Sequence, residues 1–328
     1  MKYDLRGARA ALGLLATIAA VALIPVAQAE TWPDRPIRLV APFAPGGVTD
    51  ITARAVANRM SQELGQPVIV ENKSGAQGLI GSTIVKDSAS DGYTIVLMSS
   101  SVACVNPYLR KNMPFDVQED FEAIGIIGSV PVMMVVSPQL PMSDMRQFVD
   151  HVRQNPGRIS YSSPGVGGSA HLYGSLINAA QKIDMQHVPY RGGAPAMQAV
   201  LARDVEMTFA DTSFADSQVK TGKLKALGVS GNERWPTLPE VPTFGEQGYP
   251  SNLIGWVGLM APAKTPRLII DRLNAALRSF AEDPAQRDNL LRIGVLAIGG
   301  TPESMSAAIR DGCPPWGEAV KNAGIQPE

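Results

Sequence analysis

The chain has 328 residues, with 29 Lys and Arg against 30 Asp and Glu, and a formal net charge of −1 at pH 7. It contains no run of basic residues, so a nucleic acid or an anionic membrane surface has no charge cluster to bind. The 2 cysteines, Cys104 and Cys313, are too few for a tetrahedral thiolate metal site. We therefore expect neither a nucleic-acid partner nor a metal centre of that kind.

The first residues are typical of a secretion signal. A basic start that includes Lys2 and Arg6 precedes an apolar run over 10–24, and Ala27-Gln28-Ala29 supplies the small residues that a signal peptidase reads. The apolar run is shorter than the ~20 residues that span a bilayer, although a membrane anchor or an ordinary helix remains the alternative. We expect a signal peptide over 1–29, cleavage after Ala29 and a mature protein in the periplasm.

Strand and helix patterns then alternate along the chain. Short apolar runs predict strands, and apolar residues spaced by three and four predict helices. In the first half the predicted strands are 37–43, 67–72 and 93–98, the helices are 50–64, 78–88 and 102–110, and two apolar stretches fill 121–137. A helix capped by Ser143 is predicted to run to Gln154.

The second half continues in the same way. Its predicted strands are 158–163, 185–190, 205–210, 224–230 and 256–262, and its predicted helices are 168–182, 194–202, 213–221, 266–281, 284–293, 302–311 and 315–322. This order predicts an α/β fold with mainly parallel sheets. The length suggests two lobes, and we place the crossings near Val130 and Ile254. Lobe I is then 30–130 plus 255–328, and lobe II is 131–254.

A glycine-rich loop joins the first strand to the first helix. Two glycines allow a ligand to approach the backbone, and a helix start offers unpaired N–H groups with a partial positive charge, which suits a carboxylate or phosphate. The alternative is a tight turn capped by Thr49 or Asp50. The candidate ligand-binding residues are Phe43, Ala44, Pro45, Gly46, Gly47 and Asp50.

A second loop has the same order of strand, glycines and helix. It contains a weak dinucleotide pattern from Gly165 to Ala170, but the nearest suitable acid, Asp184, precedes its strand, whereas a ribose-binding acid should follow one. A structural turn and a second anion-binding loop remain open. The candidate residues are Ser163, Gly165, Val166, Gly167, Gly168, Ser169 and His171.

Other polar residues follow predicted strands. Ser99 and Ser100 could offer hydroxyl groups to a ligand or cap the next helix. Arg191 could meet an acid or form a surface salt bridge. Asp211 could accept a hydrogen bond from a ligand ammonium or hydroxyl group, or cap the helix that follows.

Residues for catalysis are scarce. The three histidines, His151, His171 and His187, do not have metal-binding spacing, and no G-x-S-x-G motif occurs. A triad of Ser169, His171 and Asp211 could assemble only from residues that nothing local marks. We expect no catalytic residue, no metal and no cofactor.

Many segments together carry a resemblance that spans nearly the whole mature chain. The chain resembles the substrate-binding proteins of tripartite tricarboxylate transporters, the Bug-type periplasmic receptors. The matching segments are WPDRPIRLVAPFAPGGVTDITAR (32–54), LGQPVIVENKSGAQGLIG (64–81), DGYTIVL (91–97), NPYL (106–109), HVPYRGGAPAM (187–197), TGKLKALGVS (221–230), LPEVPTFGEQGYP (239–250), WVGLMAPAKTP (256–266) and NAGI (322–325).

The resemblance implies a type II periplasmic-binding-protein fold with two lobes, each a mainly parallel sheet flanked by helices, and a ligand in the cleft between them. It implies a monomeric receptor that closes on a small carboxylate, held by the two loops through backbone groups and water, for an inner-membrane permease. Asp211 matches an acidic position often near the ligand. Gln77 departs from the family, since many relatives have glycine there, and it could reach the rim of the cleft.

Three interpretations stay open beside this one: a receptor that feeds a sensor kinase, a secreted α/β hydrolase-like enzyme, and a lyase-like protein of the same fold. The residues that line the cleft distinguish them, because an enzyme needs a nucleophile within reach of a base. Cys104 and Cys313 could form a disulfide in an oxidising compartment or remain buried thiols.

Overall fold

The computed structural model describes residues 32–250 and 253–327. The predicted signal peptide over 1–29 lies outside the described residues. The chain divides into two units, Met1–Asp34 and Arg35–Glu328, and the helices and strands reported below belong to the second. Among the described residues, no helix has the length and apolar character needed to cross a membrane.

The first sheet has six strands in the order β11-β4-β10-β3-β1-β2. Its strands are β1 (Ile37–Ala41), β2 (Val68–Asn72), β3 (Thr94–Ser99), β4 (Phe121–Val130), β10 (Gly255–Pro262) and β11 (Leu296–Ala297). Strand β1 pairs in parallel with β2 and β3, whereas β10 runs antiparallel between β3 and β4.

The second sheet has five strands in the order β7-β6-β8-β5-β9. Its strands are β5 (Val132–Val136), β6 (Ile159–Ser163), β7 (Met185–Pro189), β8 (Met207–Asp211) and β9 (Lys225–Val229). Strand β6 pairs in parallel with β7 and β8, and β5 runs antiparallel between β8 and β9. Each sheet thus has three neighbouring parallel strands followed by an antiparallel one, and the first sheet has a second antiparallel strand, β11, which pairs with β4. The predicted α/β fold with two sheets is confirmed.

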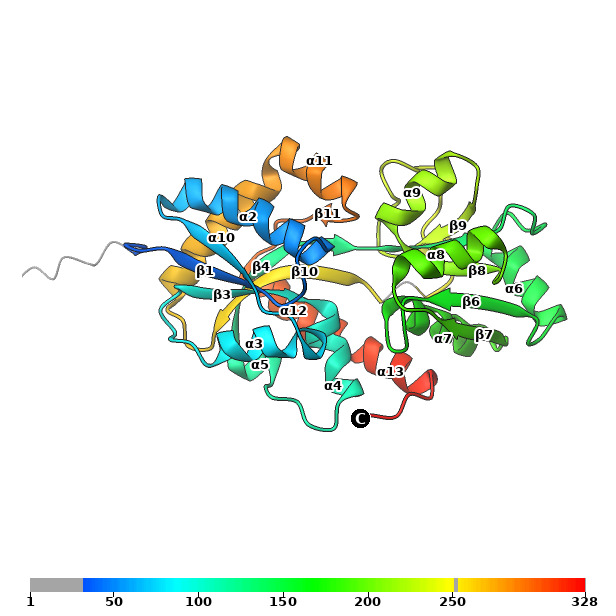
Figure 1. Ribbon diagram of the computed structural model, residues 1–328, viewed down its shortest axis with the longest axis horizontal. Coiled ribbons are helices and arrows are strands. Elements are labelled where there is room, and N and C mark those ends of the chain that lie inside the picture. Colours follow the sequence, from blue (N-terminus) through cyan, green and yellow to red (C-terminus); the bar gives the residue numbers. More distant parts are fainter. Residues whose placement is uncertain (1–31, 251–252, 328) are drawn as a thin grey trace, which may run out of the picture. The chain divides into compact units, whose positions relative to one another are not determined.

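Helices cover both faces of the first sheet (Figure 1). Helices α2 (Val48–Leu64) and α10 (Arg267–Glu282) pack together over one face, and α3 (Leu79–Lys86) and α12 (Pro302–Gly312) lie over the other. The smaller elements on this side of the chain are the 3-10 helix η1 (Ala76–Gly78), the π-helix η2 (Ser101–Val105), α4 (Asn106–Leu109), α5 (Val117–Asp120) and α11 (Pro284–Arg292).

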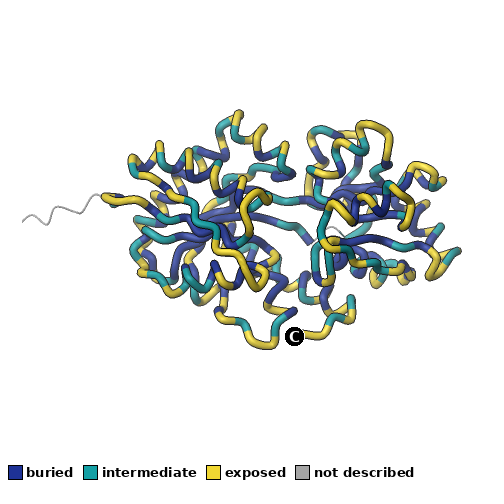
Figure 2. Tube along the Cα trace, in the orientation of Figure 1, coloured by how far each residue is buried: buried dark blue, intermediate teal, exposed yellow. Residues whose placement is uncertain are grey.

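The second sheet is covered in the same way. Its helices are α6 (Met145–Gln154), α7 (Ser169–Gln181), α8 (Gly193–Ala202) and α9 (Thr212–Lys220), with a 3-10 helix η3 (Gly245–Gln247) before β10. Alternate residues of β5 point to opposite faces: Met134 belongs to a core with Phe148 and Tyr173, and Met133 to a core with Val200. Figure 2 shows the buried strands within exposed outer helix surfaces.

The last helix, α13 (Pro314–Asn322), packs against α7 of the second sheet and against η2 beside the first. The strands of the first sheet fall within 37–130 and 255–297, and those of the second within 132–229. The predicted lobe boundaries lie between these ranges and remain a prediction.

One local prediction was wrong. The cap of α6 is Asp144, whose carboxylate accepts a hydrogen bond from the Gln147 amide at 2.8 Å, and not Ser143. The helix predicted over 102–110 is present, as the π-helix η2 followed by the single turn α4. Helical spacing in the sequence does not distinguish a π-turn from an α-helix, because both bury one face.

Candidate ligand-binding pocket

A pocket of about 300 Å³ lies where strand ends of the two sheets meet. Residues at or just after the carboxyl ends of β1, β3, β6 and β8 line it, and this is where open α/β sheets bind ligands. The lining residues are Phe43, Val48, Thr49, Ser99, Ser100, Ser101, Val105, Val130, Val132, Gly167, Gly168, Ser169, Tyr173, Asp211, Leu253, Gly255, Trp256, Val257 and Trp316.

The start of α2 faces this pocket without a side-chain cap. Its N-cap is Gly47, with φ −83° and ψ 170°, and no side chain there accepts the first helical N–H groups. Val48 and Thr49 of the first turn line the pocket. Because first-turn amides have no acceptor within their own helix, they remain available to an anion.

Asp50 holds the loop before α2 in place. Its carboxylate accepts hydrogen bonds from the Gly46 amide at 2.9 Å and from Asn72 Nδ2 at 2.9 Å, and it forms an ion pair with Arg54 at 3.0 Å. Burial acts to raise the pKa of Asp50, but the Gly46, Arg54 and Asn72 contacts outweigh it and lower the pKa below its usual value. The Gly46 amide is thus occupied, so the loop presents its helix-start amides instead.

The start of α7 repeats the arrangement from the second sheet. Its N-cap is Gly168, with φ −72° and ψ 162°, again without a side-chain cap, and Ser169 lines the pocket. The preceding Gly167 amide donates to Nδ1 of His171 at 3.1 Å. Two uncapped helix starts, one beside each sheet, therefore open into one pocket.

Two stacked histidines contact the loop that precedes α7 on the side away from the pocket lining. The rings of His171 and His187 stack with centroids 3.8 Å apart, and Nε2 of His187 lies 2.6 Å from Oγ of Ser163. Burial lowers the pKa of both histidines, to about 4 for His187, where repulsion from His171 adds to the effect. The Ser163–His187 contact resembles a nucleophile and base, but Ser163 is 0% exposed and is not among the residues that line this pocket. It is therefore a structural hydrogen bond.

Asp211 contributes the one acidic side chain of the lining that the structure describes. It is the last residue of β8 and precedes α9, but its carboxylate makes no capping hydrogen bond. Among the described residues no donor contacts this carboxylate, and burial raises its pKa. The sequence left open whether Asp211 caps a helix, and the structure shows that it does not.

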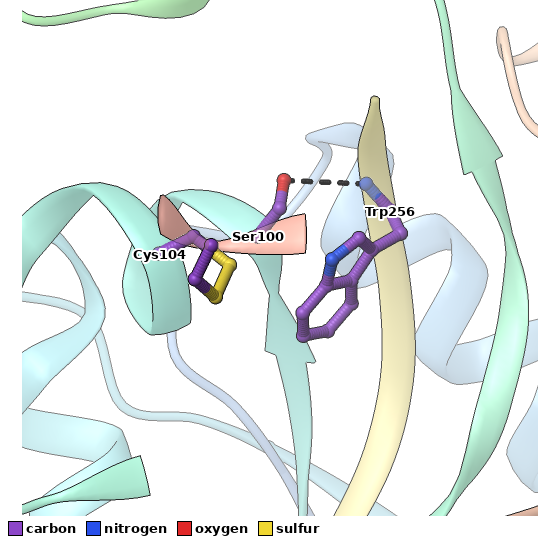
Figure 3. The surroundings of a disulfide bond; sticks show 4 residues. Ser100, Cys104 and Trp256 are labelled. Carbon is purple, nitrogen blue, oxygen red and sulfur yellow. Dashed lines mark hydrogen bonds between the residues drawn. A yellow bond between two sulfur atoms is a disulfide. The ribbon is translucent and has the colours of Figure 1, made fainter. Parts of the chain in front are cut away.

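A disulfide bond lies next to the part of the pocket that Trp256 and Trp316 line. Cys104 of η2 is bonded to Cys313, which lies at the start of α13. Figure 3 shows this bond beside Ser100, whose hydroxyl accepts a hydrogen bond from the Trp256 amide at 3.2 Å. Trp316 of α13 lines the same pocket. The disulfide therefore connects two elements that supply lining residues.

A second pocket of about 330 Å³ adjoins the first and shares residues of both glycine loops with it. Gln77, at the left-handed φ of 56°, lines this second pocket, and Asn106 donates to the Gln77 carbonyl at 3.1 Å. Val166, which is 59% exposed, lies at its other side. Gln77 therefore lines the adjoining pocket, and its contact with a ligand remains a prediction.

The predicted site residues divide into three groups. Those that line the main pocket are Phe43, Ser99, Ser100, Gly167, Gly168, Ser169 and Asp211. Those that line only the adjoining pocket are Gln77, Gly165 and Val166. Those outside both linings are Ala44, Pro45, Gly46, Gly47, Asp50, Ser163, His171 and Arg191.

Several residues of the third group have structural roles near the pocket. Gly47 caps α2, Asp50 fixes the first loop, and Ser163 and His171 lie behind the second. Arg191 is exposed after β7. Their assignment as ligand contacts remains a prediction.

The aromatic residues of the lining were not predicted from the sequence. Tyr173, Trp256 and Trp316 come from α7, β10 and α13, which are far apart in the sequence. The one signal in the sequence was the large size of these side chains, which is typical of binding surfaces as well as of cores. Among the described residues no group of three or more His, Cys, Asp or Glu could hold a metal ion.

Comparison with known proteins identifies the family. Residues 52–325 match the family described as the tripartite tricarboxylate transporter family receptor. The chain is 34% identical to a UPF0065 protein of Bordetella pertussis, over 96% of this chain and 97% of the relative.

Solved structures agree with this assignment. The periplasmic binding protein BugD is 34% identical, with a TM-score of 0.72 over 90% of this chain and 100% of BugD. R. palustris Rpa4515 with adipate is 30% identical, with a TM-score of 0.76 over 90% of this chain and 100% of Rpa4515. The chain therefore belongs to the tripartite tricarboxylate transporter receptor family, a family of solute-binding receptors and not of enzymes.

Proposed function

We propose that this protein is a periplasmic receptor that captures a small carboxylate in the main pocket and delivers it to the permease of a tripartite tricarboxylate-type system. The observation that carries the proposal is the pair of glycine-capped helix starts, α2 and α7, that open into one pocket. Among the described lining residues there is no Lys or Arg, so helix-start amides must meet the charge of an anion. The adipate complex of a relative supports the ligand class.

Glycine at both caps has a specific consequence. A Ser, Thr, Asp or Asn cap would bond the first-turn amides, whereas glycine leaves them free. Gly47 has an extended φ, and a Cβ added there would meet nothing closer than the Ala44 carbonyl at 3.9 Å. The backbone at this position therefore accepts other residues, and the site can be tested without disturbing the fold.

The proposal includes secretion and removal of the signal peptide. The protein reaches the periplasm with residues 1–29 removed after Ala29, and it works there as a monomer. Mass measurement of the mature protein from the periplasm tests the cleavage site. A mature chain that starts elsewhere than at Glu30 would contradict it.

The binding claim is tested with two substitutions at one position. Gly47→Asp places a carboxylate that both caps α2 and repels the ligand, so we expect a loss of affinity of roughly tenfold to several hundredfold, given ~1–4 kcal/mol of repulsion at about 4 Å. Gly47→Ala adds neither charge nor cap, so we expect affinity close to that of the wild type. The measurement is calorimetric titration with the best carboxylate from a thermal-shift screen that includes adipate.

Melting curves of the unliganded variants supply the control. Because Asp is a favourable N-cap, we expect Gly47→Asp to melt no lower than Gly47→Ala. A folded Gly47→Asp protein that binds its acid like the wild type would show that the carboxylate lies elsewhere.

A further inference from the structure

Among its described residues the main pocket has one charged side chain, and its sign is the same as that of the proposed ligand. Asp211 is the one ionisable group of this described lining besides the Tyr173 phenol, and the Tyr173 hydroxyl already donates to the Leu253 carbonyl. The remaining lining is apolar or aromatic, with serine and threonine hydroxyls and glycine backbone.

Asp211 ends the strand that neighbours the one leading into α7. Strands β6 and β8 are neighbours, with Ser162 opposite Thr208, so the loop that precedes α7 and the end of β8 emerge side by side at one sheet edge. Adjacent strands are about 4.8 Å apart. In a pocket of about 300 Å³, any second charge on a ligand is held near this carboxylate.

No described residue neutralises Asp211. Within this part of the chain no donor contacts its carboxylate, and Val132, its partner on β5, is apolar. Asp211 is partly exposed, and covering its carboxylate with a ligand that offers no donor is costly, whereas a ligand that donates a hydrogen bond or carries an ammonium group removes that cost. A ligand with a second carboxylate there increases it.

We propose that the ligand of this receptor carries one carboxylate, an apolar body and a hydrogen-bond donor, hydroxyl or ammonium, that meets Asp211, and that dicarboxylates are disfavoured. This inference rests on the proposed function, because it takes the carboxylate to lie at the two helix starts. The aromatic residues Phe43, Trp256 and Trp316 surround the apolar body.

Two matched sets of acids test the inference. One set is caproate, ε-aminocaproate and adipate, which share chain length and differ at the far end. The other is benzoate, para-hydroxybenzoate and terephthalate. By calorimetric titration at pH 7 we expect the donor-bearing acid of at least one set to bind at least about tenfold more tightly than its dicarboxylate, a difference of ~1.4 kcal/mol.

The variant Asp211→Asn separates the charge of Asp211 from the shape of the pocket. With the charge removed, we expect the dicarboxylate to gain affinity and the ammonium-bearing acid to lose it, so that the tenfold preference disappears. Asp204→Asn, at an exposed position before β8, should leave both affinities unchanged. Melting of unliganded Asp211→Asn should stay close to that of the wild type, because the Asp211 carboxylate makes no capping hydrogen bond that the substitution would remove.

The outcomes are distinct. If the dicarboxylate of each set binds as tightly as the donor-bearing acid, or if Asp211→Asn leaves the preference unchanged, the inference is wrong and the receptor function stands. If no carboxylate in either set or in the wider screen binds, the proposed function is wrong, and the inference with it.

Discussion

At the scale of single residues, the second glycine loop depends on a buried histidine pair. His171 Nδ1 accepts the Gly167 amide, so it must be unprotonated, and His187 stacks on it. Both therefore favour the neutral state, which agrees with the direction of their pKa shifts. Protonation of either histidine in acid should therefore destabilise the loop that precedes α7.

The sign of this pH effect follows from linkage. An unfolded histidine has a pKa near 6.5, whereas folding lowers the pKa of His187 to about 4. Between these values the unfolded chain binds more protons, so the free energy of unfolding falls as pH falls from about 6.5 to about 4. We expect a loss of about 1–2 kcal/mol from His187 after a discount for solvent screening.

Urea unfolding at neutral and mildly acidic pH measures this loss. His187→Asn should flatten the pH dependence over that window. An identical slope in wild type and His187→Asn would show that the pair does not titrate on unfolding.

At the scale of elements, the disulfide joins η2 to α13, which also packs on α7. It closes a loop with a sequence separation of 209 residues, and such crosslinks typically contribute about 2–4 kcal/mol. We expect the Cys104→Ser, Cys313→Ser double variant to lose about that much in urea unfolding. Ligand affinity should also fall, because Val105 and Trp316 of the joined elements line the pocket.

Mass spectrometry of the unreduced protein checks the bond itself. Intact Cys104 and Cys313 should resist alkylation until a reductant is added. Two thiols that alkylate at once, or a double variant as stable as the wild type, would contradict the role given to this crosslink.

Element positions could be predicted from the sequence because most depend on local patterns. Apolar spacing located α2, α7 and α10 to within about two residues, since their buried faces repeat every three to four residues. The short strand β11 and the helix α5 were missed, because neither is long enough to show a period. The antiparallel orientation of β5 and β10 within their sheets depends on pairing between distant segments, which a local sequence pattern does not indicate.

The site was predicted less completely, for the same reason. The glycine loops could be found because strand, glycines and helix are consecutive in the sequence. The aromatic lining residues could not be found in this way, because Trp256 and Trp316 come close to the loops only after the chain has folded. The hydrogen bonds from Gly46 to Asp50 and from Gly167 to His171 are local, but their geometry depends on backbone angles that residue type does not determine.

At the scale of the whole molecule, the proposal requires the two sheets to close on the ligand. The described structure already has contacts between them: the Thr212 hydroxyl donates to the Gly294 carbonyl at 3.4 Å, and α13 packs on α7. The chain passes from β4 of the first sheet to β5 of the second at Pro131, and we expect the hinge at this crossing. We expect small-angle scattering to give a smaller radius of gyration with the carboxylate bound than without it. A larger radius on binding would contradict closure.

The central claim is that helix starts beside the two sheets hold one carboxylate together. The most direct test is a calorimetric double-mutant cycle with Gly47→Asp and Gly168→Asp, each compared with its alanine variant. Both N-caps have extended φ values and room for a Cβ. Because both new charges would meet the same ligand group, we predict that each single variant loses at least about tenfold in affinity and that the double variant loses more than either one. If either single variant binds like the wild type, the two helix starts do not share one carboxylate.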